Sequence, residues 1–285
     1  MKIITNWAGF FSNFLKYIAW TLCYENEKII FHFVDTIEKT GQSKTMNPIS
    51  TITPNLLYKE NIWDIMFIKK EEYSLEDLNG QACETNFPRE GYPSPLNKIN
   101  NGYIYCNANI YRHEHFQQIR EIYYGETQKL TLTPYIKEYI HKNSKALVYP
   151  EETIAVFIRF PGHYNDKNDN IYDIISEVEI LLHKHNLSYI YLVTMVDEYM
   201  KLFMDKFKNK VIMFGNKRLT NIKMDWIDDM QDYKQECIDC FSEVYVASKC
   251  KFAIGASSNM LLGCLFLNPT MEFKIFDITA NSHGL

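Results

Sequence analysis

The stretch that decides the fold is TIAVFIRFPGHY, residues 153–164, in which an apolar run leads to a single arginine, Arg159. The residues before the arginine have the length and the β-branched content of a buried strand, and Pro161-Gly162 after it favour a turn. In α/β sheets, ligands bind outside the carboxyl ends of the strands. Because the planar guanidinium fork suits a phosphate, the stretch predicts a phosphate-binding arginine at a strand end.

The segments that follow alternate between helix and strand at the spacing of a parallel sheet. Residues 171–185 have the apolar stripe of an amphipathic helix. The pattern predicts further strands at 188–194, 210–214 and 251–255, and further helices at 198–207, 235–247 and 260–267. We therefore expect a regular α/β region from about residue 150 to about residue 270. The sequence makes no prediction for the tail from Met271.

The start of the chain has a similar order of elements. A strand is predicted at 2–7, a turn at Ala8-Gly9, a helix at 11–26 and a second strand at 28–34. This order is a βαβ unit. Residues 79–101 are rich in Gly, Pro and Asn, as in a long loop, and helical spacing returns at 113–124 and 133–141. The boundary between two α/β regions is predicted at 143–150.

Composition argues against several classes of protein. The 285 residues carry a net charge of −5, which does not favour binding to nucleic acid or to an anionic membrane. The seven cysteines are odd in number and scattered, as in a reducing compartment. Cys237 and Cys240 form a single CxxC, more typical of one helix face than of a zinc site. Without a signal-peptide pattern or about 20 consecutive apolar residues, we expect a soluble cytoplasmic protein with no transmembrane segment.

Polar groups stand at three predicted strand ends in the regular region. The first end carries Arg159. The other two carry Thr194 with Asp197, and the run GASSNM with Ser257, Ser258 and Asn259. The serine run opens a helix, where N–H groups and the helix dipole attract an anion, although a serine there is equally an N-cap. Arg159 by itself is equally a surface ion-pair partner. Together on one sheet edge, these groups predict a diphosphate clamp.

Four segments resemble the fucosyltransferase superfamily that includes α-1,6-fucosyltransferases, nodulation fucosyltransferases and protein O-fucosyltransferases. GFFSNF at 9–14 resembles its N-terminal glycine-rich turn, and VFIRFPGHY at 156–164 resembles its strand and turn with the pattern His-x-Arg-x-x-Asp. IYLVTMVDEYM at 190–200 is similar to its strand ending in Ala-Thr-Asp-Asp. IDCFSEVYVASKCKFAIGASSNM at 238–260 resembles its helix, strand and Ser-Ser turn. Order and spacing agree over most of the chain.

The resemblance implies an α/β fold of the GT-B kind, with two Rossmann-like lobes that each have a parallel sheet and flanking helices. Residues 1–148 would form the acceptor-side lobe and residues 149–285 the lobe that binds a nucleotide sugar. Arg159 falls on the family arginine that contacts the donor phosphates, and Ser257 to Asn259 fall on the phosphate-binding turn. Glu243 falls where the family often has an aspartate that accepts from guanine. Its other interpretation is a solvated charge on an amphipathic helix.

Guanine is favoured over uracil on chemical grounds as well. A carboxylate only accepts hydrogen bonds and can accept two at once. Guanine presents N1–H and its N2 amine side by side, whereas uracil presents N3–H alone. The sequence departs from the family beside the arginine, where Phe157 replaces a histidine and His163 replaces an aspartate, with Pro161 apparently inserted. The sugar itself is therefore left open.

The expected reaction is an inverting sugar transfer without a metal ion, since no Asp-x-Asp motif stands out on the carboxyl edge. A base must take the proton of the acceptor hydroxyl, and His163, Asp166 and Asp169 are the candidates. The acceptor side is predicted to involve the first glycine turn. Its residues are Gly9, Phe10 and Asn13.

Three alternatives remain open. The first keeps the fold and changes the donor to xylose, rhamnose or another sugar, with UDP-linked donors included. The second is a protein that binds a nucleotide or glycan without catalysis. The third is an unrelated α/β protein in which the four segments are ordinary strand-turn-helix units.

Overall fold

The computed structural model describes residues 1–5, 10–24, 26–34, 37–40, 43–46, 51–57, 59–84, 110–158, 171–215 and 232–276. The chain packs as two compact units. Unit 1 comprises residues 1–139 and 230–241, and unit 2 comprises residues 140–229 and 242–285. Two helices, α6 (Pro134–Asn143) and α10 (Tyr233–Ala247), each begin in unit 1 and end in unit 2.

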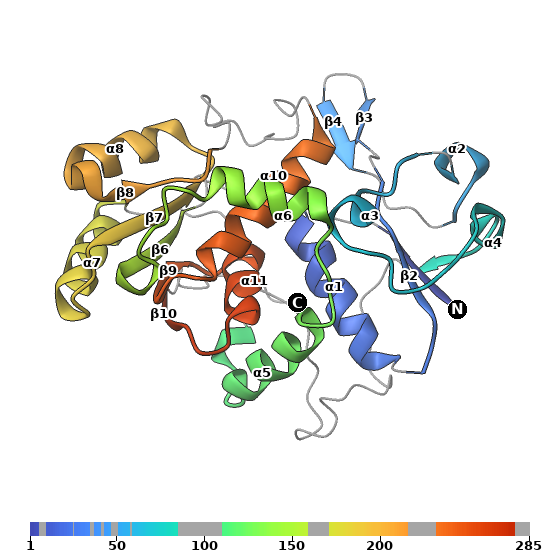
Figure 1. Cartoon of the computed structure of the whole chain (residues 1–285), viewed down its shortest axis with the longest axis horizontal. Coiled ribbons are helices and arrows are strands. Elements are labelled where there is room, and N and C mark those ends of the chain that lie inside the picture. The colour runs from blue at the N-terminus through green and yellow to red at the C-terminus, as the bar shows by residue number, and fades with distance from the viewer. Residues whose placement is uncertain are drawn as a thin grey trace. The chain divides into compact units, whose positions relative to one another are not determined.

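Unit 2 is built on a five-stranded parallel sheet, with the strand order β10-β9-β6-β7-β8 (Figure 1). The strands are β6 (Thr153–Ile158), β7 (Tyr189–Thr194), β8 (Val211–Ile212), β9 (Phe252–Ala256) and β10 (Glu272–Phe276). The first four lie at the predicted places. The edge strand β10 was missed because its five residues are only half-buried, and so short a segment carries little periodic signal.

Helices cover both faces of this sheet. On one face, α7 (Ile171–Lys184) and α8 (Asp197–Phe207) share a buried core with alternate residues of β6, β7 and β9. On the other face, the Tyr191 hydroxyl donates to the backbone oxygen of Glu243 in α10 at 3.4 Å. Helix α11 (Asn259–Leu267) contacts β9. Because successive side chains of a strand point to opposite faces, this is a three-layer α/β arrangement.

Unit 1 contains the predicted βαβ element. Strand β1 (Lys2–Thr5), helix α1 (Phe10–Cys23) and strand β2 (Ile29–His32) follow one another, and β1 pairs in parallel with β2. Strand β5 (Cys83–Glu84) extends the parallel sheet on the far side of β1, giving the order β2-β1-β5. A parallel sheet in each unit confirms the predicted α/β fold class.

Shorter elements complete unit 1 (Figure 1). An antiparallel hairpin pairs β3 with β4. In its described residues, unit 1 also has β3 (Ile37–Thr40), β4 (Ser43–Met46), α2 (Pro54–Leu57), α3 (Ile62–Met66), α4 (Leu75–Leu78), η2 (Ile110–Arg112) and α5 (Phe116–Thr127). Unit 2 adds two short 3-10 helices, η3 (Pro150–Glu152) and η4 (Lys208–Lys210). None of the helices in the described ranges is both long and apolar enough to cross a membrane.

The core of unit 1 that lies against α1 is made of aromatic rings. Phe14, which is fully buried, has the rings of Phe67 and Phe241 at centroid distances of 6.3 Å and 5.9 Å. Trp63 lies 4.4 Å from both Phe31 and Phe67. These rings come from α1, β2, the α3 region and α10. Offset and edge-on pairs of this kind add about 0.5–1.5 kcal/mol each beyond the burial of their area.

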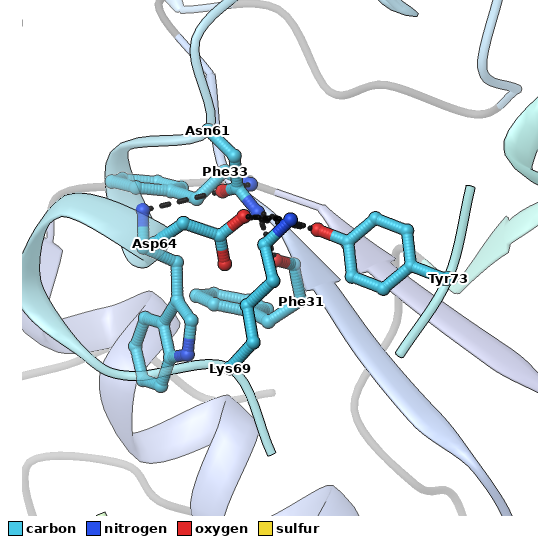
Figure 2. A network of polar contacts seen from close by, with 7 residues as sticks. Phe31, Phe33, Asn61, Asp64, Lys69 and Tyr73 are labelled. Carbon is cyan, nitrogen blue, oxygen red and sulfur yellow. Dashed lines mark hydrogen bonds and ion pairs between the residues drawn. The ribbon is translucent and has the colours of Figure 1, made fainter. Parts of the chain in front are cut away.

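One buried amide holds the end of β2 in place (Figure 2). The Oδ1 of Asn61 accepts from the backbone N–H groups of Phe33 and Trp63, at 2.8 Å and 3.2 Å. Its Nδ2 donates to the carbonyl of Phe31 at 2.8 Å and to the hydroxyl of Tyr73 at 3.1 Å. Asn61 therefore caps α3 and ties this helix to the residues that leave β2.

Candidate functional site

The site begins with the order of strands in unit 2. The chain runs from β6 to β7 and β8 on one side, and then returns to β9 and β10 on the other side of β6. The direction of winding therefore reverses between β6 and β9. In open α/β sheets, the crevice outside the carboxyl ends at such a reversal is where ligands bind.

The residues predicted to bind phosphate follow, along the chain, the two strands that flank this reversal. Strand β6 ends at Ile158, and Arg159 is the next residue of the chain. Strand β9 ends at Ala256, and Ser257 and Ser258 follow before α11 begins at Asn259. Arg159, His163, Asp166 and Asp169 themselves lie outside the described residues, as does Gly9 of unit 1.

The close approach of β6 and β9 depends on a glycine. Gly255 pairs with Phe157 in the parallel ladder. A Cβ at Gly255 would lie 2.8 Å from the Cβ of Phe157 and would also meet the backbone carbonyl of that residue. The two strands can therefore converge here only because residue 255 has no side chain. The predictions did not include Gly255, and its place directly before the serine turn was the available signal.

The serine turn opens α11. Ser258 is 1% exposed, and its Oγ accepts from the backbone N–H of Leu261 at 3.2 Å, so the N-cap interpretation is confirmed for this residue. Ser257 and Asn259 beside it are partly exposed. Six consecutive residues of α11, from Leu261 to Phe266, are buried. The body of α11 is therefore fixed in the core, while its N-terminus, where the helix dipole attracts an anion, stays partly open to solvent.

The end of β7 is organised differently. Thr194 is 2% exposed and lies opposite Ile158 in the ladder, and its Oγ1 accepts from the backbone N–H of Val196 at 3.3 Å. Asp197 is the first residue of α8, where Val196 provides no side-chain cap. A carboxylate in a first helical turn stabilises the helix dipole. The same negative charge would repel a phosphate, so Asp197 at this position does not favour phosphate binding, and a role of Thr194 or Asp197 in donor binding stays a prediction.

Glu243 is buried rather than exposed to solvent. Its side chain is only 3% exposed, so the interpretation as a solvated charge is wrong. Its backbone oxygen meets the hydroxyl of Tyr191, which stands three residues before the end of β7. Measured along the strand, this is roughly 10 Å below the carboxyl edge. A ligand base that reached Glu243 would have to extend well below the level of the phosphate groups.

The acceptor-side residues lie at the start of α1 in unit 1. Phe10 is 5% exposed and packs against Phe11, Phe33 and Phe241, which gives it a structural role in the aromatic core. Asn13 is fully buried. One turn further along, Lys16 is also fully buried, an uncommon environment for a lysine that the predictions missed. A role of Phe10 or Asn13 in binding an acceptor stays a prediction.

These features define an α/β fold of the GT-B kind. Among solved structures, NodZ α-1,6-fucosyltransferase soaked with GDP-fucose has the same fold, with a TM-score of 0.55 and 13% identity over 99% of this chain and 96% of that chain. Fucosyltransferase NodZ from Bradyrhizobium also has a TM-score of 0.55 and 13% identity, over 98% of this chain and 96% of that chain. NodZ α-1,6-fucosyltransferase co-crystallised with GDP has a TM-score of 0.53 and 13% identity, over 94% of this chain and 92% of that chain.

The chain therefore has a fucosyltransferase-like GT-B fold, as the resemblance implied. No protein-family profile and no curated protein sequence matches it. At 13% identity, the likeness establishes the fold alone.

Proposed function

We propose that this protein is a glycosyltransferase that moves a sugar from a nucleotide donor, with GDP-fucose as the first choice, to a glycan or glycoprotein acceptor. The observation that carries the proposal is the winding reversal of unit 2. Its two flanking strands lead to Arg159 on one side and to the serine turn of α11 on the other. A cationic fork and a helix N-terminus at one crevice suit a diphosphate.

The proposed reaction inverts the configuration at the sugar and uses no metal ion. The acceptor oxygen forms a bond to C1 of the sugar while the bond from C1 to the phosphate oxygen breaks, and the nucleoside diphosphate leaves with the electron pair. The acceptor proton passes to a base, for which His163, Asp166 and Asp169 remain the candidates. Arg159 and the serine turn stabilise the leaving charge, each preorganised donor contributing about 3 kcal/mol.

GDP is proposed as the leaving group for two reasons. The solved structures with this fold include one soaked with GDP-fucose and one co-crystallised with GDP. In this chain, the two oxygens of the buried Glu243 carboxylate could accept from the two adjacent donors of guanine. Uracil offers a single donor, so one carboxylate oxygen would have no donor from that base.

A thermal-shift screen of the full chain with GDP, UDP, ADP and dTDP tests the donor. A ligand that binds only the native state stabilises it and so raises the melting temperature. At a ligand concentration of a hundred times Kd, the gain in the free energy of unfolding is about 2.7 kcal/mol. We expect the largest shift with GDP, and a loss of the preference for GDP over UDP in Glu243→Gln. A shift with UDP and none with GDP would reject the assignment of Glu243.

Substitution of the arginine tests the reaction. Arg159→Ala should abolish sugar transfer from GDP-fucose while leaving the melting temperature unchanged. Arg112→Ala, on an exposed 3-10 helix of unit 1, is the matched control and should retain activity. Sugar transfer at the wild-type rate in Arg159→Ala would rule out the mechanism.

A second candidate is a protein that binds a nucleotide or glycan without catalysis. It is favoured by Phe157, which is 2% exposed and stands where the superfamily has a histidine, so that no polar group is supplied there. Hydrolysis of GDP-fucose, measured as released fucose, separates the two candidates. Slow hydrolysis that Arg159→Ala removes supports the transferase, and GDP binding with no hydrolysis and no transfer to any acceptor supports the binding protein.

A further inference from the structure

Unit 1 contains a polar cavity at the amino edge of its sheet. The cavity has a volume of about 470 Å³ and lies against Ile29, the first residue of β2, and against the last turns of α1. A second cavity of about 40 Å³ shares Tyr17, Lys70 and Glu71 with it. The larger volume falls within the roughly 300–1,000 Å³ of small-molecule sites. The predicted acceptor residues Phe10 and Asn13 lie at the opposite end of α1.

Tyr17 is the buried member of this cavity. It is 8% exposed, and its ring is fixed against Trp63 and Phe31 at centroid distances of 4.6 Å and 5.6 Å. Within the described part of the chain, no group forms a hydrogen bond with its hydroxyl. Burial, together with the nearby charges of Glu126 and Glu71, raises the pKa of Tyr17 to about 12, so the hydroxyl remains a donor at neutral pH. The ring is packed while the residue lines the cavity, so the hydroxyl can donate to a ligand there.

The charges of the lining nearly cancel. Lys129 forms an ion pair with Glu126, and Glu27 lies 3.9 Å from the amino terminus. That leaves Lys70 and Glu71, for which the described residues provide no ion-pair or hydrogen-bond partner. One ammonium and one carboxylate give no net charge with which to hold a phosphate or a cation. They offer donors and acceptors side by side, as the hydroxyl groups of a sugar require.

We propose that this cavity is a binding site for a neutral, hydroxyl-rich saccharide, held by the hydroxyl of Tyr17 and by Glu71 and Lys70. The cavity is lined by residues of unit 1 alone, and the proposal does not depend on the proposed transferase activity. In an enzyme that modifies glycans, it would hold a part of the acceptor or a second glycan.

The first test applies the full chain to an array of neutral, sialylated and sulfated glycans. The strongest neutral glycan is then titrated by calorimetry into the wild type, Tyr17→Phe and Glu71→Gln. We expect binding about tenfold weaker in each variant, because each loses a hydrogen bond to the ligand. Glu138→Gln, on the exposed face of α6, is the matched control and should bind as the wild type does.

Two control measurements, the melting temperature and the GDP-induced thermal shift, distinguish a loss of glycan binding from unfolding and from a defect in the donor site. Tyr17→Phe should melt no lower than the wild type, because the hydroxyl it removes has no partner. The GDP-induced thermal shift should be unchanged in both variants, so a failure of the proposed donor site does not affect this test. The proposal is overturned by an absence of neutral hits, by hits among charged glycans alone, or by full affinity in both variants.

Discussion

The core of unit 2 is largely aliphatic, whereas the core that lies against α1 in unit 1 is aromatic and stands beside a second, aliphatic cluster of unit 1 that includes Ile3, Ile30 and Val34. Unit 2 packs a five-stranded parallel sheet with many aliphatic side chains, such as Ile154, Val156 and Leu192, each completely buried. Unit 1 packs α1 against a small sheet through rings that touch one another, with Phe14 and Phe241 among them. The aliphatic core divides its burial among many small contributions, whereas the aromatic core depends on a few large ones.

The origins of these side chains differ as well. Most of the aliphatic core of unit 2 is supplied by the consecutive segments from β6 to α8, although β9 returns beside β6 from far along the chain. The aromatic core of unit 1 joins residues of α1 and α3 to Phe241, which lies in α10. We therefore expect single substitutions to damage unit 1 more than unit 2, and the following measurements test that expectation.

The largest effect is expected for Phe241→Ala. This ring is 1% exposed and lies 5.1–5.9 Å from the rings of Phe10, Phe14 and Phe67. Truncation of a buried phenylalanine costs about 3–5 kcal/mol, since it removes apolar area and leaves a cavity. The matched truncation in unit 2, Ile254→Ala, should cost less, at the lower end of about 2–5 kcal/mol. Urea unfolding of both variants measures the difference, and equal losses would contradict the contrast between the cores.

Loss of the buried amide comes next. Asn61→Ala removes the cap of α3 and leaves the N–H of Phe33 without its acceptor, which should lower the free energy of unfolding by about 2–4 kcal/mol. Ser74→Ala, which removes an exposed cap from α4, should cost about 1 kcal/mol. If the two variants melt at the same temperature, the tie between α3 and the end of β2 contributes nothing beyond capping.

The same contrast explains what could be predicted from the sequence. In unit 2, β-branched runs such as TIAVFI, and the apolar stripe of α7, predict their elements directly because each pattern is local. The capping role of Ser258 was likewise open to prediction, since a serine before an apolar run is a standard helix start. The edge strand β10 was missed because five residues are too short a run for an alternating pattern to stand out.

The packing of unit 1 and the arrangement of the candidate site could be predicted from the sequence only in part, for physical reasons. No local pattern shows that Phe241 joins rings from α1, or that Asn61 bonds the carbonyl of Phe31 in β2 and the amide of Phe33 just after it. Helical spacing predicts that Glu243 lies on a helix, but not that the packing of α10 on β7 buries it. The need for Gly255 arises from the distance between two strands, which becomes known only when they are paired.

Two glycines sharpen the comparison with effects of opposite sign. Gly255→Ala in unit 2 forces a methyl group against the backbone of Phe157, so we expect a loss of about 1–3 kcal/mol. It should also reduce the GDP-induced thermal shift, because β6 and β9 lead to the residues that we propose bind the phosphates, Arg159 and the serine turn. Gly125→Ala in α5 of unit 1 meets no atom within 4 Å and should stabilise the protein by about 0.5–1 kcal/mol. A stable Gly255→Ala variant with normal GDP binding would remove the proposed reason for this glycine.

The smallest effect is expected from an exposed contact of unit 1 that belongs to neither core. The carboxylate of Asp77 accepts from the backbone N–H of Ser74 at 2.8 Å, and this bond lowers the pKa of Asp77 below its usual value. Because the folded pKa is the lower one, the stabilisation is complete above the unfolded pKa of about 3.9 and disappears as the pH falls through the folded pKa. Asp77→Asn should therefore melt slightly below the wild type at neutral pH, and at the same temperature in strong acid. A difference that persists in strong acid would mean that Asp77 acts through its shape rather than its charge.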